Sequence, residues 1–360
     1  MVCSDSGCPA SRMVQYDTCH RGTLLSMDRR NYFWDFWKFI AAIGVILVHA
    51  PLPGNLGKCL EAVGTWGVSF FFLISGYACF GPSRETSGKI LKRLRRNGII
   101  TAIAVAVYFL FTYLVYRGDP GQMLLWKISL RKPVTYVRMI LLGDFEFIYG
   151  TALWFMVALL YGYLVFYVLV RFGLKKVIYV LLPLFLILRI AVDMRISYTN
   201  CDWHWSGNAL VGALPMMLLG YVIADNKDKL LKIPTWVLIS GSLISAGALF
   251  VTSCVKVGGQ DISTPFKILC ASLVFILGIK KPGWYIVKPI SFLGREDSLY
   301  IYLIHFMFVV LLTNYMYEHY MTAKGLSWQL PILIIIISVI TARILSVIVK
   351  LIKKVVVRTS

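Results

Sequence analysis

Three ionisable residues share the first apolar segment of the chain, DFWKFIAAIGVILVHA at 35–50, where they could do acid–base chemistry. These residues are Asp35, Lys38 and His49. The separation of Lys38 and His49 is close to three helical turns, so a helix would place both on nearly one face, about 16 Å apart. A neutral imidazole, which burial in a low-dielectric environment favours, could remove a proton from an attacking hydroxyl. The simpler alternatives are a lysine that reaches the lipid headgroups and a histidine bonded to a neighbouring helix.

Four further side chains lie in apolar segments and could orient such an imidazole or bind a substrate. Ser75 follows an aromatic run interrupted by small residues, Trp154 opens another apolar segment, and Tyr302 and His305 share the segment EDSLYIYLIHFMF. Small residues typically permit close helix contact, and interfacial anchoring accounts for tryptophan and tyrosine. Anchoring does not account for His305.

Charged residues elsewhere in apolar segments have structural interpretations. Arg189 and Asp193 are spaced i, i+4, so we expect them to pair with each other in a structural role. Arg343 has no acid nearby in the sequence. It either meets an acid from another helix or lines an anion-binding cavity.

The elements that position these residues are membrane helices. Hydrophobic residues make up 58% of the 360, only 15% are charged, and the mean hydropathy is +0.73. A bilayer crossing needs about 20 mostly apolar residues in a helix. We therefore predict an all-α, polytopic membrane helix bundle of about ten transmembrane helices, near 33–53, 62–82, 98–116, 151–171, 177–193, 207–224, 235–253, 265–280, 290–313 and 329–350.

The cations that give the net charge of +20 are gathered in alternate connectors of the chain. This distribution reflects membrane topology, and we exclude a nucleic-acid partner. Basic connectors alternate with connectors that hold few cations, and the positive-inside rule then places both termini in the cytoplasm. Residues 1–30 are predicted to be a disordered cytoplasmic tail and residues 351–360 a basic cytoplasmic tail. The outer connector 117–150 breaks the pattern with Lys127, Arg131, Lys132 and Arg138. It is expected to form an interfacial helix or a lid over a cavity.

The cysteines give no metal motif. Cys3, Cys8, Cys19 and His20 match no common zinc spacing, so we predict no metal. Cys59, Cys201 and Cys254 fall at predicted outer helix ends, where a disulfide is possible but unassigned.

Along most of residues 31–350 the chain resembles the membrane-bound acyltransferase-3 proteins, which include bacterial O-acetyltransferases of cell-envelope glycans. The family pattern is an Asp, an Arg three residues on, then ten residues and a His, which here falls on Asp35, Lys38 and His49. The segments GVSFFFLISGYACF, ILKRLRRNGI, LWFMVALLYGYL and SLYIYLIHF are similar to family segments in the same order. One departure is that Lys38 stands in place of the family arginine and lacks its planar fork.

The resemblance implies a bacterial plasma-membrane enzyme that moves an acyl group, usually acetyl, from cytoplasmic acyl-CoA to a hydroxyl or amine. The acceptor would be a cell-envelope glycan, a lipid-linked sugar or a small molecule. The other partners are membrane lipid and, as an open alternative, a second copy of the chain in a homodimer. Lys38 with Lys92, Arg93, Arg95 and Arg96 would bind the coenzyme, and His49 would act as general base, directly or through an acyl-histidine. The alternative is a transporter of a small amino acid such as serine, similar to the membrane domain of vancomycin-resistance serine racemases.

Overall fold

The fold of the described chain is entirely helical. The computed structural model describes residues 30–199, 202–254, 262–284, 286–319 and 328–359, and no strand occurs among them. The first half contains α2 (Tyr32–His49), α3 (Gly54–Gly64), α4 (Trp66–Tyr77), α5 (Ser83–Tyr116), α6 (Pro120–Arg131), α7 (Pro133–Leu142), and α8 (Trp154–Arg171). The second half contains α9 (Lys175–Thr199), α10 (Leu214–Asp225), α11 (Lys227–Leu230), α12 (Thr235–Cys254), α13 (Thr264–Lys280), α14 (Lys288–Glu296), α15 (Ser298–His319) and α16 (Gln329–Thr359).

Six helices in the described residues are long and apolar enough to cross a membrane. They are Tyr32–His49, Ser83–Tyr116, Thr151–Arg171, Lys175–Ile196, Thr235–Ser253 and Gln329–Ile352. A seventh span is obtained if α14 and α15, which meet at an angle of 77°, are counted as one broken crossing. The all-helical membrane fold is therefore confirmed, whereas the count of ten and the cytoplasmic position of the termini stay predictions.

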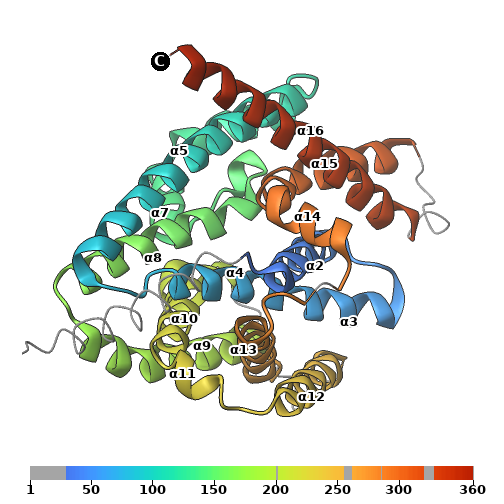
Figure 1. Cartoon of the computed structure of the whole chain (residues 1–360). Helices are drawn as coiled ribbons and strands as arrows, with labels where there is room; N and C mark the ends of the chain where they lie inside the picture. The colour runs from blue at the N-terminus through green and yellow to red at the C-terminus, as the bar shows by residue number, and fades with distance from the viewer. Residues whose placement is uncertain (1–29, 200–201, 255–261, 285, 320–327, 360) are drawn as a thin grey trace, which may run out of the picture.

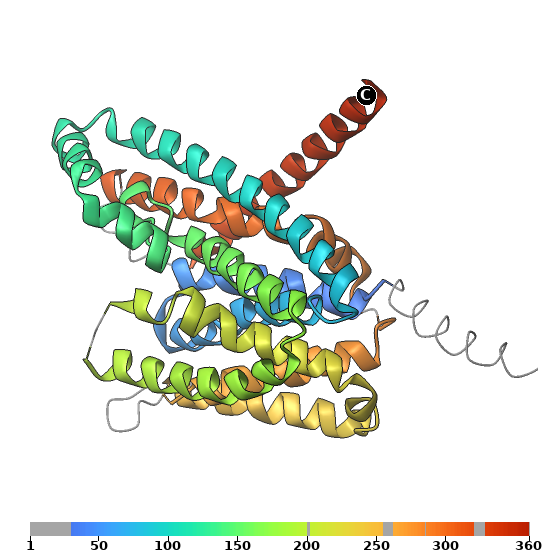
Figure 2. The same ribbon diagram turned by 90° about the vertical axis from the view of Figure 1, so that its left-hand side faces the viewer.

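The segments predicted as spans near 62–82, 207–224 and 265–280 form the shorter helices α4, α10 and α13, which lie among the other helices (Figure 1). Most side chains of α4 and α10 are buried, and Phe275 of α13 is fully buried between Phe70 and Trp34. In Figure 2 most helices run roughly parallel, while α16 extends away from the others toward the marked C-terminus. A helix inside such a bundle can be short because its neighbours screen its ends from the hydrocarbon.

Glycine contacts join α4 to its neighbours, as the small residues of this segment predict. A Cβ added at Gly76 would lie 1.9 Å from the Met217 carbonyl oxygen, and one added at Gly220 would lie 2.3 Å from the Leu73 carbonyl oxygen. The backbones of α4 and α10 therefore touch directly, which only glycine allows at both positions.

The substitution Gly76→Ala is expected to destabilise the protein by about 1–3 kcal/mol, because the new methyl group would overlap the α10 backbone. Unfolding by titration with a denaturing detergent measures the effect. Gly88→Ala in α5 is the matched control, since its Cβ would meet no atom within 4 Å. Equal stabilities of the two variants would show that the α10 backbone can move away from the added methyl group without cost.

The outer connector contains two helices, α6 and α7, as expected of an interfacial segment. Each begins with proline at its first turn, and Gly143 ends α7 in the left-handed conformation that favours glycine. Leu124, Leu125, Val137 and Leu141 expose large apolar side chains on this pair. An apolar face of this kind fits contact with lipid.

Candidate functional site

A cavity of about 650 Å³ brings several predicted site residues together. His49 reaches it from the end of α2, Trp154 from the start of α8 and Tyr302 from α15. Polar side chains from other elements complete the wall, among them Glu61, Thr65, Arg189, Asp193, Ser206, Thr252, Ser253, Thr264 and Lys267. The cavity is large enough for a drug-sized ligand and combines apolar surface with a few polar groups, as ligand sites do.

His49 lies at the wall of this cavity against a second histidine. Asn31 caps the start of α2 by accepting a hydrogen bond from the Trp34 backbone N–H, and His49 ends the helix before Pro51. The ring centroids of His49 and His305 are 5.4 Å apart, and Phe306 packs edge-on to His49 at 5.0 Å. The two predicted histidines, far apart in sequence, are thus neighbours.

His305 is fully buried and has a defined orientation. Its Nδ1 lies 2.7 Å from the Tyr302 carbonyl oxygen, which requires a proton on Nδ1. Its Nε2 is buried without a hydrogen-bond partner among the described residues. The Tyr302 hydroxyl donates to the Ala152 carbonyl at 2.5 Å, so Tyr302 contributes its ring rather than a free hydroxyl to the cavity wall.

Arg189 and Asp193 form the predicted pair, with Nε and Oδ2 3.7 Å apart, and both line the cavity. The Arg189 guanidinium also donates to the carbonyl oxygens of Val211 and Gly212. Asp193 accepts hydrogen bonds from the hydroxyls of Ser206 and Thr264, the latter at 2.7 Å. The pair therefore joins α9 to the following loop and to α13 while it presents charge to the cavity.

Arg343 meets an acid from another helix, which is the first of the two alternatives predicted. Its Nη1 lies 3.6 Å from Oδ1 of the fully buried Asp297, and its guanidinium stacks 4.6 Å from the centre of the Phe292 ring. Arg343 is absent from the cavity wall. It joins α16 to the bend between α14 and α15.

At the opposite end of α2 from His49, Asp35 binds two cations. Lys38 Nζ lies 3.1 Å from Oδ1, and Arg30 Nε lies 3.4 Å from Oδ2. Asp35 is buried, while about a quarter of the Lys38 side chain is exposed. The helical spacing thus places Lys38 and His49 at the two ends of α2, as predicted.

The other predicted site residues lie on α4 and α5, outside the cavity wall. The Ser75 hydroxyl donates to the Phe71 carbonyl at 3.0 Å. Arg93 donates to the Ala78 carbonyl at 2.5 Å and fixes the turn that joins α4 to α5. Lys92, Arg95 and Arg96 are exposed on α5, where they are free to meet an anion.

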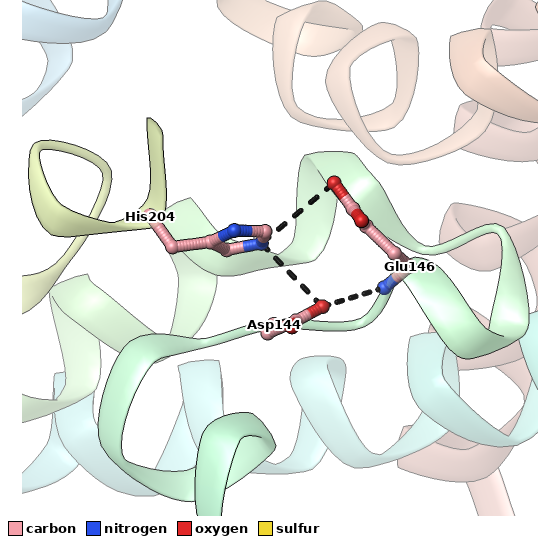
Figure 3. A group of neighbouring side chains, drawn as sticks. All are labelled: Asp144, Glu146 and His204. Carbon is pink, nitrogen blue, oxygen red and sulfur yellow. Dashed lines mark hydrogen bonds and ion pairs between the residues drawn. The ribbon is translucent and has the colours of Figure 1, made fainter. Parts of the chain in front are cut away.

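Sequence reasoning missed a second polar cluster, which consists of Asp144, Glu146 and His204 (Figure 3). It lies beside the cavity, because Trp203 of the cavity wall stacks on His204. Asp144 and Glu146 follow α7, and His204 lies in the loop after α9. Asp202 and Arg138 border the cluster, with Arg138 bonded to Asp202 at 2.6 Å. Partial burial alone would raise the pKa of Asp202, but hydrogen bonds from Arg138 and His204 lower it to about 2.

The model of the acyltransferase-3 family, described as an acyltransferase domain, matches residues 31–351. The chain belongs to this family. Neither a curated protein nor a solved structure matches it. Membership identifies this acyltransferase-3 protein as a transferase of acyl groups, and the six apolar helices identify it as a multi-pass membrane protein.

Sequence reasoning on this acyltransferase-3 protein identified part of the cavity wall. It named His49, Trp154 and Tyr302, which the cavity brings together, and His305 directly behind His49. It assigned Arg189 and Asp193 to structure alone, because i, i+4 pairing accounted for both charges. It missed Glu61, which lines the cavity but in the sequence is only an acidic residue next to an apolar segment.

Proposed function

We propose that this protein transfers an acyl group, usually acetyl, from cytoplasmic acyl-CoA to a hydroxyl or amine of a cell-envelope glycan, a lipid-linked sugar or a small acceptor in a bacterial plasma membrane. The observation that carries the proposal is the position of His49 in the wall of a polar cavity. A general base must lie where the acceptor's proton can reach it, and His49 satisfies that condition.

His49 acts on the acceptor in this scheme. Its imidazole takes the proton of the attacking hydroxyl while the acceptor oxygen bonds to the thioester carbon. The carbon–sulfur bond then breaks, and the sulfur of coenzyme A takes the proton from the imidazolium and leaves as the thiol. An acyl-histidine formed first and then attacked by the acceptor gives the same balance in two steps.

The donor reaches His49 from the other end of α2. Lys38, together with Lys92, Arg95 and Arg96 of α5, supplies positive charge for the phosphates of coenzyme A, and phosphates bind such charge through charge-assisted hydrogen bonds. The span of about 16 Å between Lys38 and His49 along the helix axis suits an extended pantetheine arm. Arg189 and Lys267, which line the cavity, are cations that could stabilise the developing oxyanion.

Membranes that contain the protein are expected to incorporate label from radioactive acetyl-CoA and to release free thiol, whereas membranes without it are not. A transporter of a small amino acid would do neither. Absence of both label and thiol release, with the protein folded and acceptor-bearing membranes present, would reject the proposal.

The Lys38→Met variant is expected to raise the KM for acetyl-CoA about tenfold, because loss of one charge-assisted contact costs roughly 1.5 kcal/mol or more. Lys38→Arg should retain the wild-type value or improve it, since arginine also holds phosphate bidentately. Lys89→Met is the matched control, because Lys89 is exposed and pairs with Glu85 across one helical turn. An unchanged KM in Lys38→Met would remove Lys38 from the donor site.

A further inference from the structure

The cluster of Asp144, Glu146 and His204 has the composition and spacing of a metal site. One ligand atom from each residue lies within 4.8 Å of the other two. His204 Nε2 is 3.4 Å from Asp144 Oδ1 and 3.9 Å from Glu146 Oε1. Tetrahedral ligands at metal distances of 2.0–2.1 Å lie about 3.4 Å apart, so small side-chain movements would complete the coordination.

The histidine itself indicates that a cation belongs at this point. His204 is 2% exposed, and its Nε2 has no hydrogen-bond partner among the described residues although it points at Asp144 and Glu146 (Figure 3). Its Nδ1 lies 2.5 Å from Asp202 Oδ1, which retains the proton on Nδ1. Nε2 then faces one oxygen of each carboxylate, so the three atoms converge on one point where a cation could be bound.

The surrounding contacts are those of a metal centre with oriented ligands. A carboxylate on the second nitrogen of a ligating histidine is the usual outer partner in such sites, and Asp202 supplies it. Arg138 binds Oδ2 of Asp144 at 2.7 Å, which leaves Oδ1 directed at His204. Arg138 balances one of the three carboxylate charges in this cluster, and the remaining negative charge favours a divalent cation.

We propose that Asp144, Glu146 and His204 bind a divalent transition-metal ion, with Asp202 as the outer partner of the histidine. One imidazole and two carboxylates suit Zn²⁺ or Mn²⁺, and the nitrogen ligand disfavours Ca²⁺ and Mg²⁺. The ion joins the segment after α7 to the loop after α9. The neighbouring Trp203 lines the cavity, stacks on His204 at 4.0 Å and donates to Glu146 at 3.2 Å, so the ion would hold one wall of the cavity in place.

The test is Zn²⁺ binding by the purified full-length protein in detergent, measured by calorimetry and by metal analysis after dialysis. About one ion per chain is expected above the background of the N-terminal thiols. That ion should be lost in His204→Gln and bound at least tenfold more weakly in Glu146→Gln. Asp202→Asn is expected to weaken binding about 10–100-fold while it leaves all three ligands present.

Controls separate the loss of a metal site from misfolding. Glu85→Gln is matched to Glu146→Gln, since both glutamates are more than half exposed, and it should bind Zn²⁺ as the wild type does. Glu146→Gln also guards against the loss of fold that removal of the buried His204 could cause. Zn²⁺ stoichiometry and affinity identical in the wild type, His204→Gln and Glu146→Gln would overturn the proposal.

Discussion

Replacement of His49 by glutamine is expected to lower the rate of acyl transfer about 10²–10⁴-fold, the usual contribution of a positioned general base. Glutamine keeps the approximate length and polarity of histidine but cannot accept a proton at neutral pH. The KM for acetyl-CoA should change little, because the proposed phosphate contact of Lys38 lies about 16 Å from His49 along α2. The measurement is label transferred from acetyl-CoA to membranes under donor saturation.

Two further measurements, of folding and of acetyl-CoA hydrolysis, are needed to interpret the activity of the His49→Gln variant. Size-exclusion chromatography and thermal unfolding in detergent establish that the variant is folded, which is expected because the His49 side chain borders a cavity instead of filling the core. Hydrolysis of acetyl-CoA without acceptor then separates the two mechanisms, since an acyl-histidine could form and hydrolyse without acceptor. Transfer by His49→Gln at the wild-type rate would eliminate both.

The substitution Asp193→Asn is expected to destabilise the protein by about 3 kcal/mol, at the low end of the range for a broken buried ion pair. Asparagine preserves the hydrogen bonds with Ser206 and Thr264. It removes the charge that balances Arg189, whose side chain is only 11% exposed. The free energy of unfolding, measured by titration with a denaturing detergent, should fall accordingly.

A double variant isolates the charge effect. Arg189→Met combined with Asp193→Asn removes both charges and should be more stable than Asp193→Asn alone, because no unbalanced guanidinium remains. Equal losses in the single and the double variant would show that Asp193 acts through its contacts with the loop and α13 and not through Arg189.

The fold class could be predicted from apolar stretches, whereas the count of ten crossings stays a prediction. Hydropathy measures how apolar a segment is and not what surrounds it, so α4 and α10, which are buried in protein, resemble lipid-facing spans. Hydropathy also gave no sign of the 77° bend between α14 and α15, a region that was predicted as one span near 290–313. The length of α5 was underestimated, since no proline interrupts Ser83–Tyr116 and this 34-residue helix includes the basic connector.

The candidate site was predictable where one helix determines the geometry. Helical periodicity alone relates Lys38 to His49. The contact between His49 and His305 depends on how α2 packs against α15, and the cluster around His204 depends on two loops from distant parts of the sequence. Tertiary packing determines such contacts, and a single sequence contains no signal for them.

Lys38, which stands where the resemblance expects an arginine, shares the Asp35 carboxylate with Arg30. Arg30 brings a guanidinium to the same carboxylate that Lys38 binds, and stacking on Tyr32 at 4.3 Å holds it there. A planar donor group is therefore still present at this end of α2, displaced by about two turns along the chain. Two cations against one carboxylate leave a single positive charge. The two cations thus differ in kind, so an anion that reaches Lys38 would also meet a guanidinium from outside α2.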